Sequence, residues 1–117
     1  VRLRELWESP DAFRVDGMWG QKAMARLFRA RRDHDFDPRP LHGIKAPLQA
    51  RRNGRYPLAD LSIYHLGMLS GEARLARRRR YELADPNGLW QQVGYAYLTD
   101  ERGLRLAKID PRRRYTE

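Results

Sequence analysis

The segment from Leu58 to Ala84 most constrains the fold, because it predicts a strand followed closely by a helix. In its first part, residues 58–66, apolar side chains occur on both faces of an alternating pattern. One face holds Leu61, Ile63 and His65, and the other holds Ser62, Tyr64 and Leu66. Because both faces are partly apolar, we expect this strand to lie inside a sheet.

The helix is predicted over residues 70–84. Ser70 is a preferred N-cap residue, and the carboxylate of Glu72 in the first turn suits the helix dipole. The helix is expected to stop before Pro86, which cannot continue it. The expected core stripe is Ala73, Ala76, Leu83 and Ala84, and the run Arg77 to Arg80 is expected mostly on the outer face.

The remaining segments predict shorter elements. Residues 2–8 suggest a helical turn, while residues 13–15 and 104–109 suggest strands. A second helix is expected over about 87–98, where Leu89, Trp90, Val93 and Tyr97 have helical spacing. Residues 45–57 contain Pro, Gly, Asn and Arg, and predict an exposed loop. The fold class is therefore α+β, with a few short strands followed by two helices in a single domain over 1–117.

Composition limits the kinds of partner. The chain has 24 Lys and Arg against 15 Asp and Glu, a formal charge of +9, which favours an anionic partner. It has no cysteine, so disulfides and thiolate metal sites are excluded, and a reducing cytoplasm is the expected compartment. No apolar run reaches the roughly 20 residues of a membrane span. Because the first residue is Val1, we expect the chain to belong to a longer protein.

The stretch "DHDFDPRPLHG", residues 33–43, contains three carboxylates and two imidazoles. An EF-hand loop starting at Asp33 would need Gly at its sixth position and Glu at its twelfth, where this chain has Pro38 and Ile44. The acids therefore predict a polar turn in which carboxylates accept local backbone N–H groups. His42, which precedes Gly43, is either a ligand-facing imidazole or a histidine packed at a loop mouth.

The sequence allows two interpretations for each of three other residues. His65 lies near the carboxyl end of the predicted strand, where ligands of α/β sheets bind, or it is a satisfied buried histidine. Asp16 in "RVDGMWG" is either a catalytic base or a turn residue before Gly17. Trp19 is either a platform for stacking a sugar or a core anchor.

Several strings in order resemble the second half of family-two, GT-A type glycosyltransferases. The chain has "RVDGMW" at 14–19, "RLFR" at 26–29, "LHG" at 41–43 and "IYHLGM" at 63–68, followed by the arginine-rich segment. The tail "WQQVGYAYLTDERGLRL" is similar to an actinobacterial-type branch. The resemblance covers nearly the whole chain and implies a Rossmann-like GT-A fold. It also implies sugar transfer from a nucleotide-sugar donor to an acceptor hydroxyl, with Mn²⁺ or Mg²⁺ at the donor diphosphate.

The resemblance assigns roles residue by residue. His42 matches a histidine near the donor phosphates or the metal, and His65 matches the strand histidine. Arg26 and Arg29 match arginines that could face the diphosphate. Asp16 and Trp19 match an acceptor-side loop, which makes Asp16 the catalytic candidate of this chain. The main nucleotide and metal ligands would lie in the preceding half, so the isolated chain is expected to be inactive and to hold no metal alone.

Two alternatives come from other functional classes. A small basic module for nucleic acid or another polyanion would need the arginines gathered on one face, yet the sequence shows no helix-turn-helix, zinc-finger or aromatic RNA-binding motif. A structural or oligomerising domain would use the aromatic residues of the predicted last helix, Trp90, Tyr95 and Tyr97.

Overall fold

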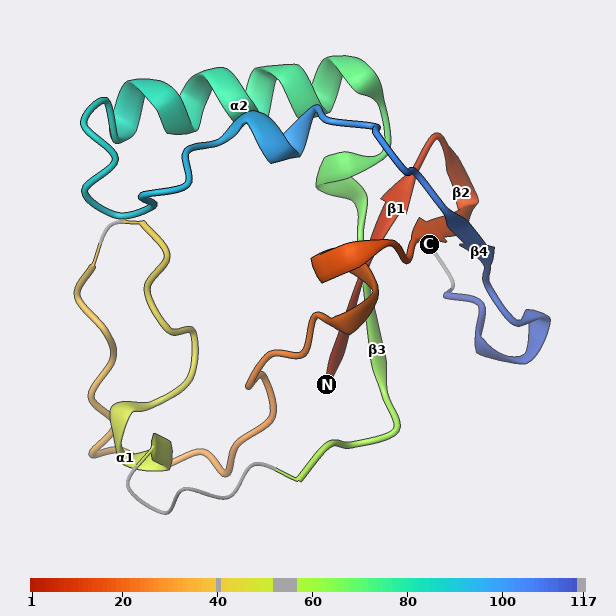
Figure 1. Ribbon diagram of the computed structural model, residues 1–117. Helices are drawn as coiled ribbons and strands as arrows, with labels where there is room; N and C mark the ends of the chain where they lie inside the picture. Colours follow the sequence, from red (N-terminus) through yellow and green to blue (C-terminus); the bar gives the residue numbers. More distant parts are fainter. Residues whose placement is uncertain (40, 52–56, 116–117) are drawn as a thin grey trace.

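A computed structural model describes residues 1–39, 41–51 and 57–115 of the chain. Four strands form one sheet in the order β3-β1-β2-β4 (Figure 1). β1 (Arg2–Trp7) pairs in parallel with β3 (Ser62–His65) and antiparallel with β2 (Ser9–Arg14). β2 also pairs antiparallel with β4 (Leu106–Lys108). With the helix α2 (Gly71–Ala84), this arrangement confirms the α+β class.

β1 is one of the two inner strands of the sheet, so the helical turn predicted for residues 2–8 is wrong. Its segment "RLRELW" is rich in good helix formers, but intrinsic propensity is a weak preference that tertiary contacts override. Here the strand has a hydrogen-bonded neighbour on each side, and its last three residues, Glu5, Leu6 and Trp7, are fully buried. The strand therefore gains two ladders of hydrogen bonds and a buried end, which a helical turn would lose.

β3 confirms the predicted strand over a shorter range, but not its expected position. Within the described residues it forms one edge of the sheet, with β1 as its partner. Leu61 and Ile63 are 54% and 39% exposed, so the apolar residues of this edge are only partly covered. The predicted strand over 104–109 is confirmed in part as β4.

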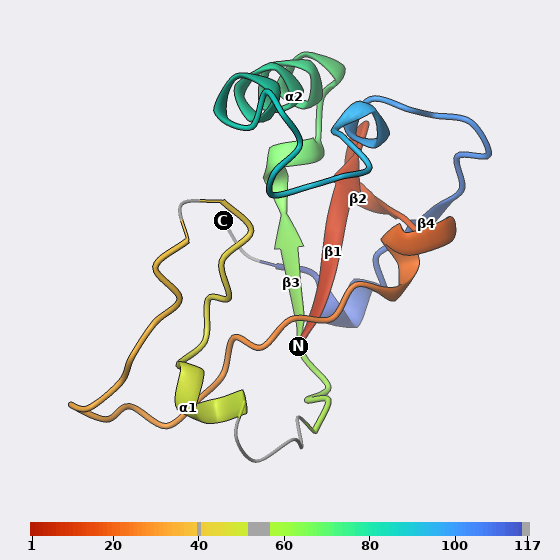
Figure 2. The ribbon, with the colours of Figure 1, turned by 60° about the vertical axis from the view of Figure 1, so that its left-hand side comes forward.

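The helix α2 confirms the prediction over 70–84, including its cap. The hydroxyl of Ser70 accepts a hydrogen bond of 3.1 Å from the backbone N–H of Ala73. The helix lies across the carboxyl ends of β1 and β3, and both views of the ribbon show it there (Figures 1 and 2). It follows β3 through the short 3₁₀ helix η2 (Leu66–Met68).

The face that α2 turns inward differs from the expected alanine and leucine stripe. Arg74 is buried, and Arg77, Arg78 and Tyr81 are half-buried, while Leu83 is 83% exposed. The inner face is basic because the groups it meets are polar: main-chain carbonyls, carboxylates and hydroxyls. Long arginine stems cover apolar surface while their guanidinium groups bind these acceptors.

The second helix predicted over 87–98 is wrong. This segment forms turns and only one short 3₁₀ helix, η3 (Ala96–Leu98). Gly88 and Gly94 have φ values of +64° and +68°, a left-handed conformation that ends a helix. The apolar spacing does not mark buried residues, because Leu89 and Val93 are 76% and 85% exposed. Two other residues of the segment, Tyr95 and Leu98, join the core cluster with Trp7, Trp19 and Met68.

The connecting segments complete the chain. The short 3₁₀ helices η1 (Gly17–Gln21) and η4 (Pro111–Arg113) follow β2 and β4. The loop predicted over 45–57 contains the four-residue helix α1 (Leu48–Arg51), and Ala46 and Pro47 before it are buried. Residues 52–56 of that predicted loop lie outside the described residues.

Candidate functional site

A cluster of charged side chains lies at the carboxyl ends of the parallel strands β1 and β3. Glu5 and His65 are opposite each other in the strand register, and His65 Nδ1 lies 2.5 Å from Glu5 Oε2. Lys22 Nζ lies 3.2 Å from the other carboxylate oxygen of Glu5. Arg77 approaches the same histidine from α2. We call Glu5, Lys22, His65 and Arg77 the Glu5 cluster.

The Glu5 carboxylate is the ionised centre of this cluster. Burial raises its pKa, but hydrogen bonds from His65 and the charge of Lys22 outweigh burial, so the pKa lies below its usual value. At neutral pH Glu5 is therefore an acceptor on both oxygens. Because an ionised carboxylate has no proton to give, His65 Nδ1 must be the donor in the 2.5 Å contact.

His42 lies at the other end of α2, in a second group of contacts. Its φ of +54° is unusual for a residue with a side chain. The imidazole stacks on Tyr95 with ring centroids 5.8 Å apart, and Tyr81 packs edge-on at 5.7 Å. Tyr81 also accepts a hydrogen bond of 3.2 Å from Arg77 Nη2. Arg77 and Tyr81 thus link the two histidines that the sequence singled out.

The protonation of His42 follows from its partners. The hydroxyl of Tyr95 donates to Asp85 Oδ2 at 2.8 Å, so its oxygen accepts the 3.1 Å contact from His42 Nε2. Burial and the hydrogen bond to Asp85 raise the pKa of Tyr95 to about 12. Asp85 also accepts the backbone N–H groups of Trp90 and Gln91. His42 Nε2 therefore carries the proton, which leaves Nδ1 as the nitrogen able to bind a ligand.

The acidic residues of the stretch 33–43 are engaged in local contacts. Asp33 pairs with Arg31 at 3.0 Å, and Asp37 pairs with Arg39 and accepts the backbone N–H of Ile44. Asp35 accepts a 3.0 Å hydrogen bond from the side-chain amide of Gln49. These contacts agree with the predicted polar turn. Over residues 1–39, 41–51 and 57–115, no three His, Asp or Glu side chains converge on a metal-sized site.

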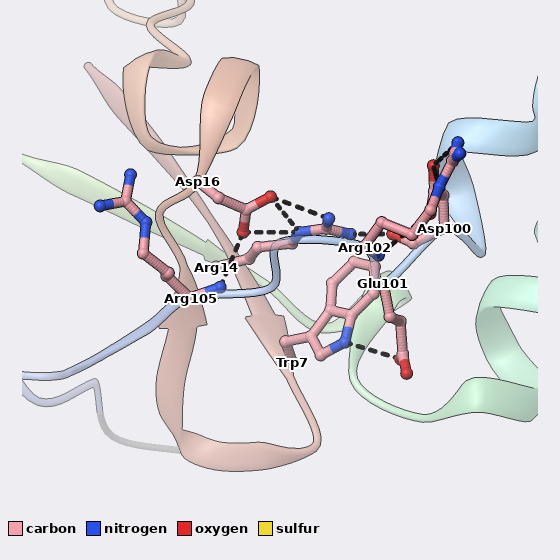
Figure 3. Close-up of polar contacts among 7 residues, drawn as sticks. All are labelled: Trp7, Arg14, Asp16, Asp100, Glu101, Arg102 and Arg105. Carbon is pink, nitrogen blue, oxygen red and sulfur yellow. Dashed lines mark hydrogen bonds and ion pairs between the residues drawn. The ribbon is translucent and has the colours of Figure 1, made fainter.

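Asp16 is bound to the buried guanidinium of Arg14, as Figure 3 shows. Arg14 donates to both carboxylate oxygens, with Nε and Nη2 at 2.9 and 2.8 Å, and to the carbonyl of Asp100 at 2.6 Å. The backbone N–H of Arg105 donates to Asp16 Oδ1 at 3.1 Å. Arg14 lowers the pKa of Asp16 to about 2, which makes the carboxylate a weak base. These contacts make Asp16 a residue that ties η1 to the segment before β4.

Trp19 has the surroundings of a core anchor. Its side chain is 4% exposed, and its ring packs against Trp7 and Tyr97 at centroid distances of 5.6 and 5.7 Å. Lys22 Nζ covers the ring at 3.9 Å. With its neighbours on all these sides, the indole offers no open face on which a sugar ring could stack. Its contact with Lys22 nevertheless connects the core to the Glu5 cluster.

Arg26 and Arg29 do not join the cluster. Arg26 Nη1 donates to the carbonyl of the adjacent Ala25 at 3.1 Å, and Arg29 is exposed. Sequence reasoning missed Glu5, Lys22 and Arg77 as members of the site. The only signal in the sequence was an acidic residue between Leu3 and Trp7, on the apolar side of an alternating pattern.

Comparisons of the chain with models of protein families, with curated proteins and with solved structures found no match. No helix within the described residues is long and apolar enough to cross a membrane. The interpretation of the site therefore depends on its residues and their geometry.

Proposed function

We propose that this chain is the C-terminal part of a GT-A type, family-two glycosyltransferase, which transfers a sugar from a nucleotide-sugar donor to an acceptor hydroxyl. The observation that carries the proposal is the connection of His42 to His65 through Tyr81 and Arg77. Both histidines match motif positions of the family, and residues 41–43 and 63–68 are far apart in the sequence. The connection lies beside the carboxyl ends of two parallel strands, where ligands of α/β sheets bind.

The chemistry of the transfer suits this collection of side chains. The leaving group is a nucleoside diphosphate, so negative charge develops on it in the transition state. Imidazole N–H groups and cations held in fixed positions stabilise such charge. As imidazolium ions, His42, held by Tyr95 through Nε2, and His65, held by Glu5 through Nδ1, would each donate from the other ring nitrogen on the donor side.

The acceptor side is assigned differently from the sequence expectation. A catalytic base has to accept a proton near neutral pH, whereas Arg14 holds the pKa of Asp16 at about 2. We therefore propose that Asp16 shapes the loop 17–21 by its contacts and that the base belongs to the preceding half of the enzyme. Trp19 would support the same loop from the core.

The described residues do not fit a metal site on their own. His42 Nε2 donates a hydrogen bond to the hydroxyl of Tyr95. The nearby carboxylate of Asp85 accepts hydrogen bonds from the same hydroxyl and from two backbone N–H groups. In the proposed enzyme, a divalent ion would be held by carboxylates of the preceding half. The residues of this chain would contribute hydrogen-bond donors and positive charge instead.

The proposal is tested on the full-length protein with a panel of nucleoside-diphosphate sugars, acceptors and Mn²⁺, by following release of the nucleoside diphosphate. Replacement of His42 by Asn suits the left-handed backbone and removes the imidazole. We expect kcat to fall about a hundredfold, the usual effect of losing one preorganised donor. His34→Ala, in the same stretch, is the matched control and should leave kcat unchanged. Full activity in His42→Asn would contradict the role of His42, and no release from any donor would contradict the proposed function.

The alternative of a basic polyanion-binding module has less support. The run Arg77 to Arg80 divides between two sides of α2, because Arg77 and Arg78 bind Tyr81 and Thr99 while the other two are exposed. At the C-terminal end, Arg113 pairs with Asp60. The arginines of the run 77–80 are thus not gathered on one face. The cytoplasm stays the expected compartment, and fractionation of cells that express the full-length protein would test it.

A further inference from the structure

Arg77 is a partly buried cation with one fully buried donor that has no partner within the described residues. A guanidinium group has five N–H donors. Nη2 of Arg77 donates to the hydroxyl of Tyr81 at 3.2 Å, but Nε is fully buried and has no hydrogen-bond partner among residues 1–39, 41–51 and 57–115. Unmade hydrogen bonds of a buried charged group are costly, so such a group calls for an explanation.

The remaining neighbour of Arg77 does not supply an acceptor. Arg77 Nη1 lies 3.4 Å from His65 Nδ1. That nitrogen already donates its proton to the ionised Glu5 carboxylate at 2.5 Å, so it has no lone pair for Arg77. The contact therefore brings two donors together, which is favourable only when an acceptor binds beside them.

The charges of the Glu5 cluster do not balance. Its one carboxylate is shared by Lys22 and His65, and within the described residues Arg77 has no ion pair with a carboxylate. Arg14 and Arg74, whose side chains are also inside the protein, are both paired with carboxylates. Burial lowers the pKa of Lys22, and the positive charge of Arg77 adds to this effect. The cluster therefore has a surplus of positive charge at a partly buried position.

The backbone of Gly67 lies close to the side chains of Arg77 and His65. A Cβ atom at this position would lie 3.2 Å from both Arg77 Nη1 and His65 Nε2, closer than side chains normally pack. A glycine therefore keeps the approach to both groups free of side-chain atoms, and any larger residue would compete with a ligand for that approach.

We propose that Arg77, assisted by Lys22 and His65, binds a phosphate-bearing anion beside Gly67. The anion would accept hydrogen bonds from Arg77 Nη1 and neutralise the surplus charge of the cluster, as charge-assisted contacts between guanidinium and phosphate do. In this proposal Arg77 takes the place that the sequence suggested for Arg26 and Arg29. Binding of a phosphate group does not depend on the proposed function, whereas its identification with the donor diphosphate does.

The test is calorimetric titration of the full-length protein with inorganic phosphate, pyrophosphate and nucleoside diphosphates at low ionic strength. The variant is Arg77→Gln, and the control is Arg79→Gln, an exposed residue two positions along the same helix. We expect Arg77→Gln to weaken pyrophosphate binding roughly tenfold to a hundredfold, the effect of losing hydrogen bonds to a charged group. Arg79→Gln should change it less than about twofold, because screening weakens the interactions of an exposed charge.

Each outcome distinguishes the two proposals. Equal losses in both variants, or no binding of phosphate compounds by the wild-type protein, would overturn the anion site. A Gly67→Ala variant that binds pyrophosphate normally would also count against it. Binding of pyrophosphate that depends on Arg77, without binding of any nucleoside diphosphate, would support the site and remove the nucleotide-sugar donor from the proposed function. If Arg77→Gln did not affect sugar transfer, the proposed function would stand, but the proposed role of Arg77 in binding the donor diphosphate would be refuted.

Discussion

Arg74 offers the sharpest test of how α2 is attached to the sheet. Its side chain is 4% exposed and donates to the carbonyl of Met68 at 2.9 Å and to the Glu101 carboxylate at 2.9 Å. It also pairs with Glu8, and its guanidinium lies 4.1 Å above the ring of Trp7. We predict that Arg74→Met, which keeps most of the side-chain volume, lowers the free energy of unfolding by about 3 kcal/mol.

The magnitude follows from what each partner loses. The carbonyl of Met68 loses its charged donor in a buried position, which costs about 1–3 kcal/mol. Arg74 also donates to the carbonyl of Leu69, but this carbonyl keeps a second hydrogen bond from the backbone N–H of Glu8, so its loss of Arg74 adds little to the destabilisation. The carboxylates of Glu8 and Glu101 are 54% and 49% exposed and become hydrated, so each pair contributes below about 1 kcal/mol. The contact with Trp7 adds about 1 kcal/mol.

Urea unfolding followed by circular dichroism measures this change through the midpoint concentration. Arg79→Met, on the exposed side of the same helix, is the control and should change stability by less than about 0.5 kcal/mol. If the two variants unfold at the same urea concentration, the guanidinium of Arg74 does not hold α2 against the sheet, and this explanation of the attachment is refuted.

Two further predictions concern acid stability and the cap of α2. Because Arg14 lowers the pKa of Asp16 from 3.8 to about 2, this group stabilises the fold above about pH 4, and the contribution is lost as the pH falls toward 2. Asp16→Asn should therefore flatten the dependence of the unfolding midpoint on pH in this range, and an unchanged slope would contradict the pairing. Ser70→Ala should cost about 1 kcal/mol in thermal unfolding, whereas Ser70→Gly should cost only a few tenths. Equal losses in the two variants would argue against the hydroxyl as the cap.

The location of the candidate site shows how far motifs alone can lead. The strings around His42 and His65 singled out two residues that the fold connects, but the same reasoning gave Asp16 and Trp19 roles that their contacts do not favour. A motif reports which residue types occur together, and it does not separate residues that face a ligand from those that support the backbone beside it. In "RVDGMW" the two charged residues, Arg14 and Asp16, form an ion pair with each other.

The prediction of a helix over residues 87–98 is wrong for a local reason, the two glycines that the sequence has there. Apolar spacing over 87–98 predicted a helix, but Gly88 and Gly94 take left-handed conformations there. Leu89 and Val93, two of the residues with that spacing, are exposed, and the segment reaches the core through Tyr95 and Leu98. Periodicity therefore predicted the wrong backbone conformation and the wrong buried face, because glycine lowers the cost of leaving the helix at two positions.

The sequence by itself determined the features that depend on neighbouring residues: the extent of α2 with its cap at Ser70, and the polar turn over 33–39. The tertiary structure decided the central place of β1, the inward face of α2 and the composition of the Glu5 cluster. Glu5 and His65 are 60 residues apart in the chain, and His42 and Tyr95 are 53 apart. Contacts over such separations depend on how the elements pack, so neither local propensity nor periodicity can predict which partner each side chain meets.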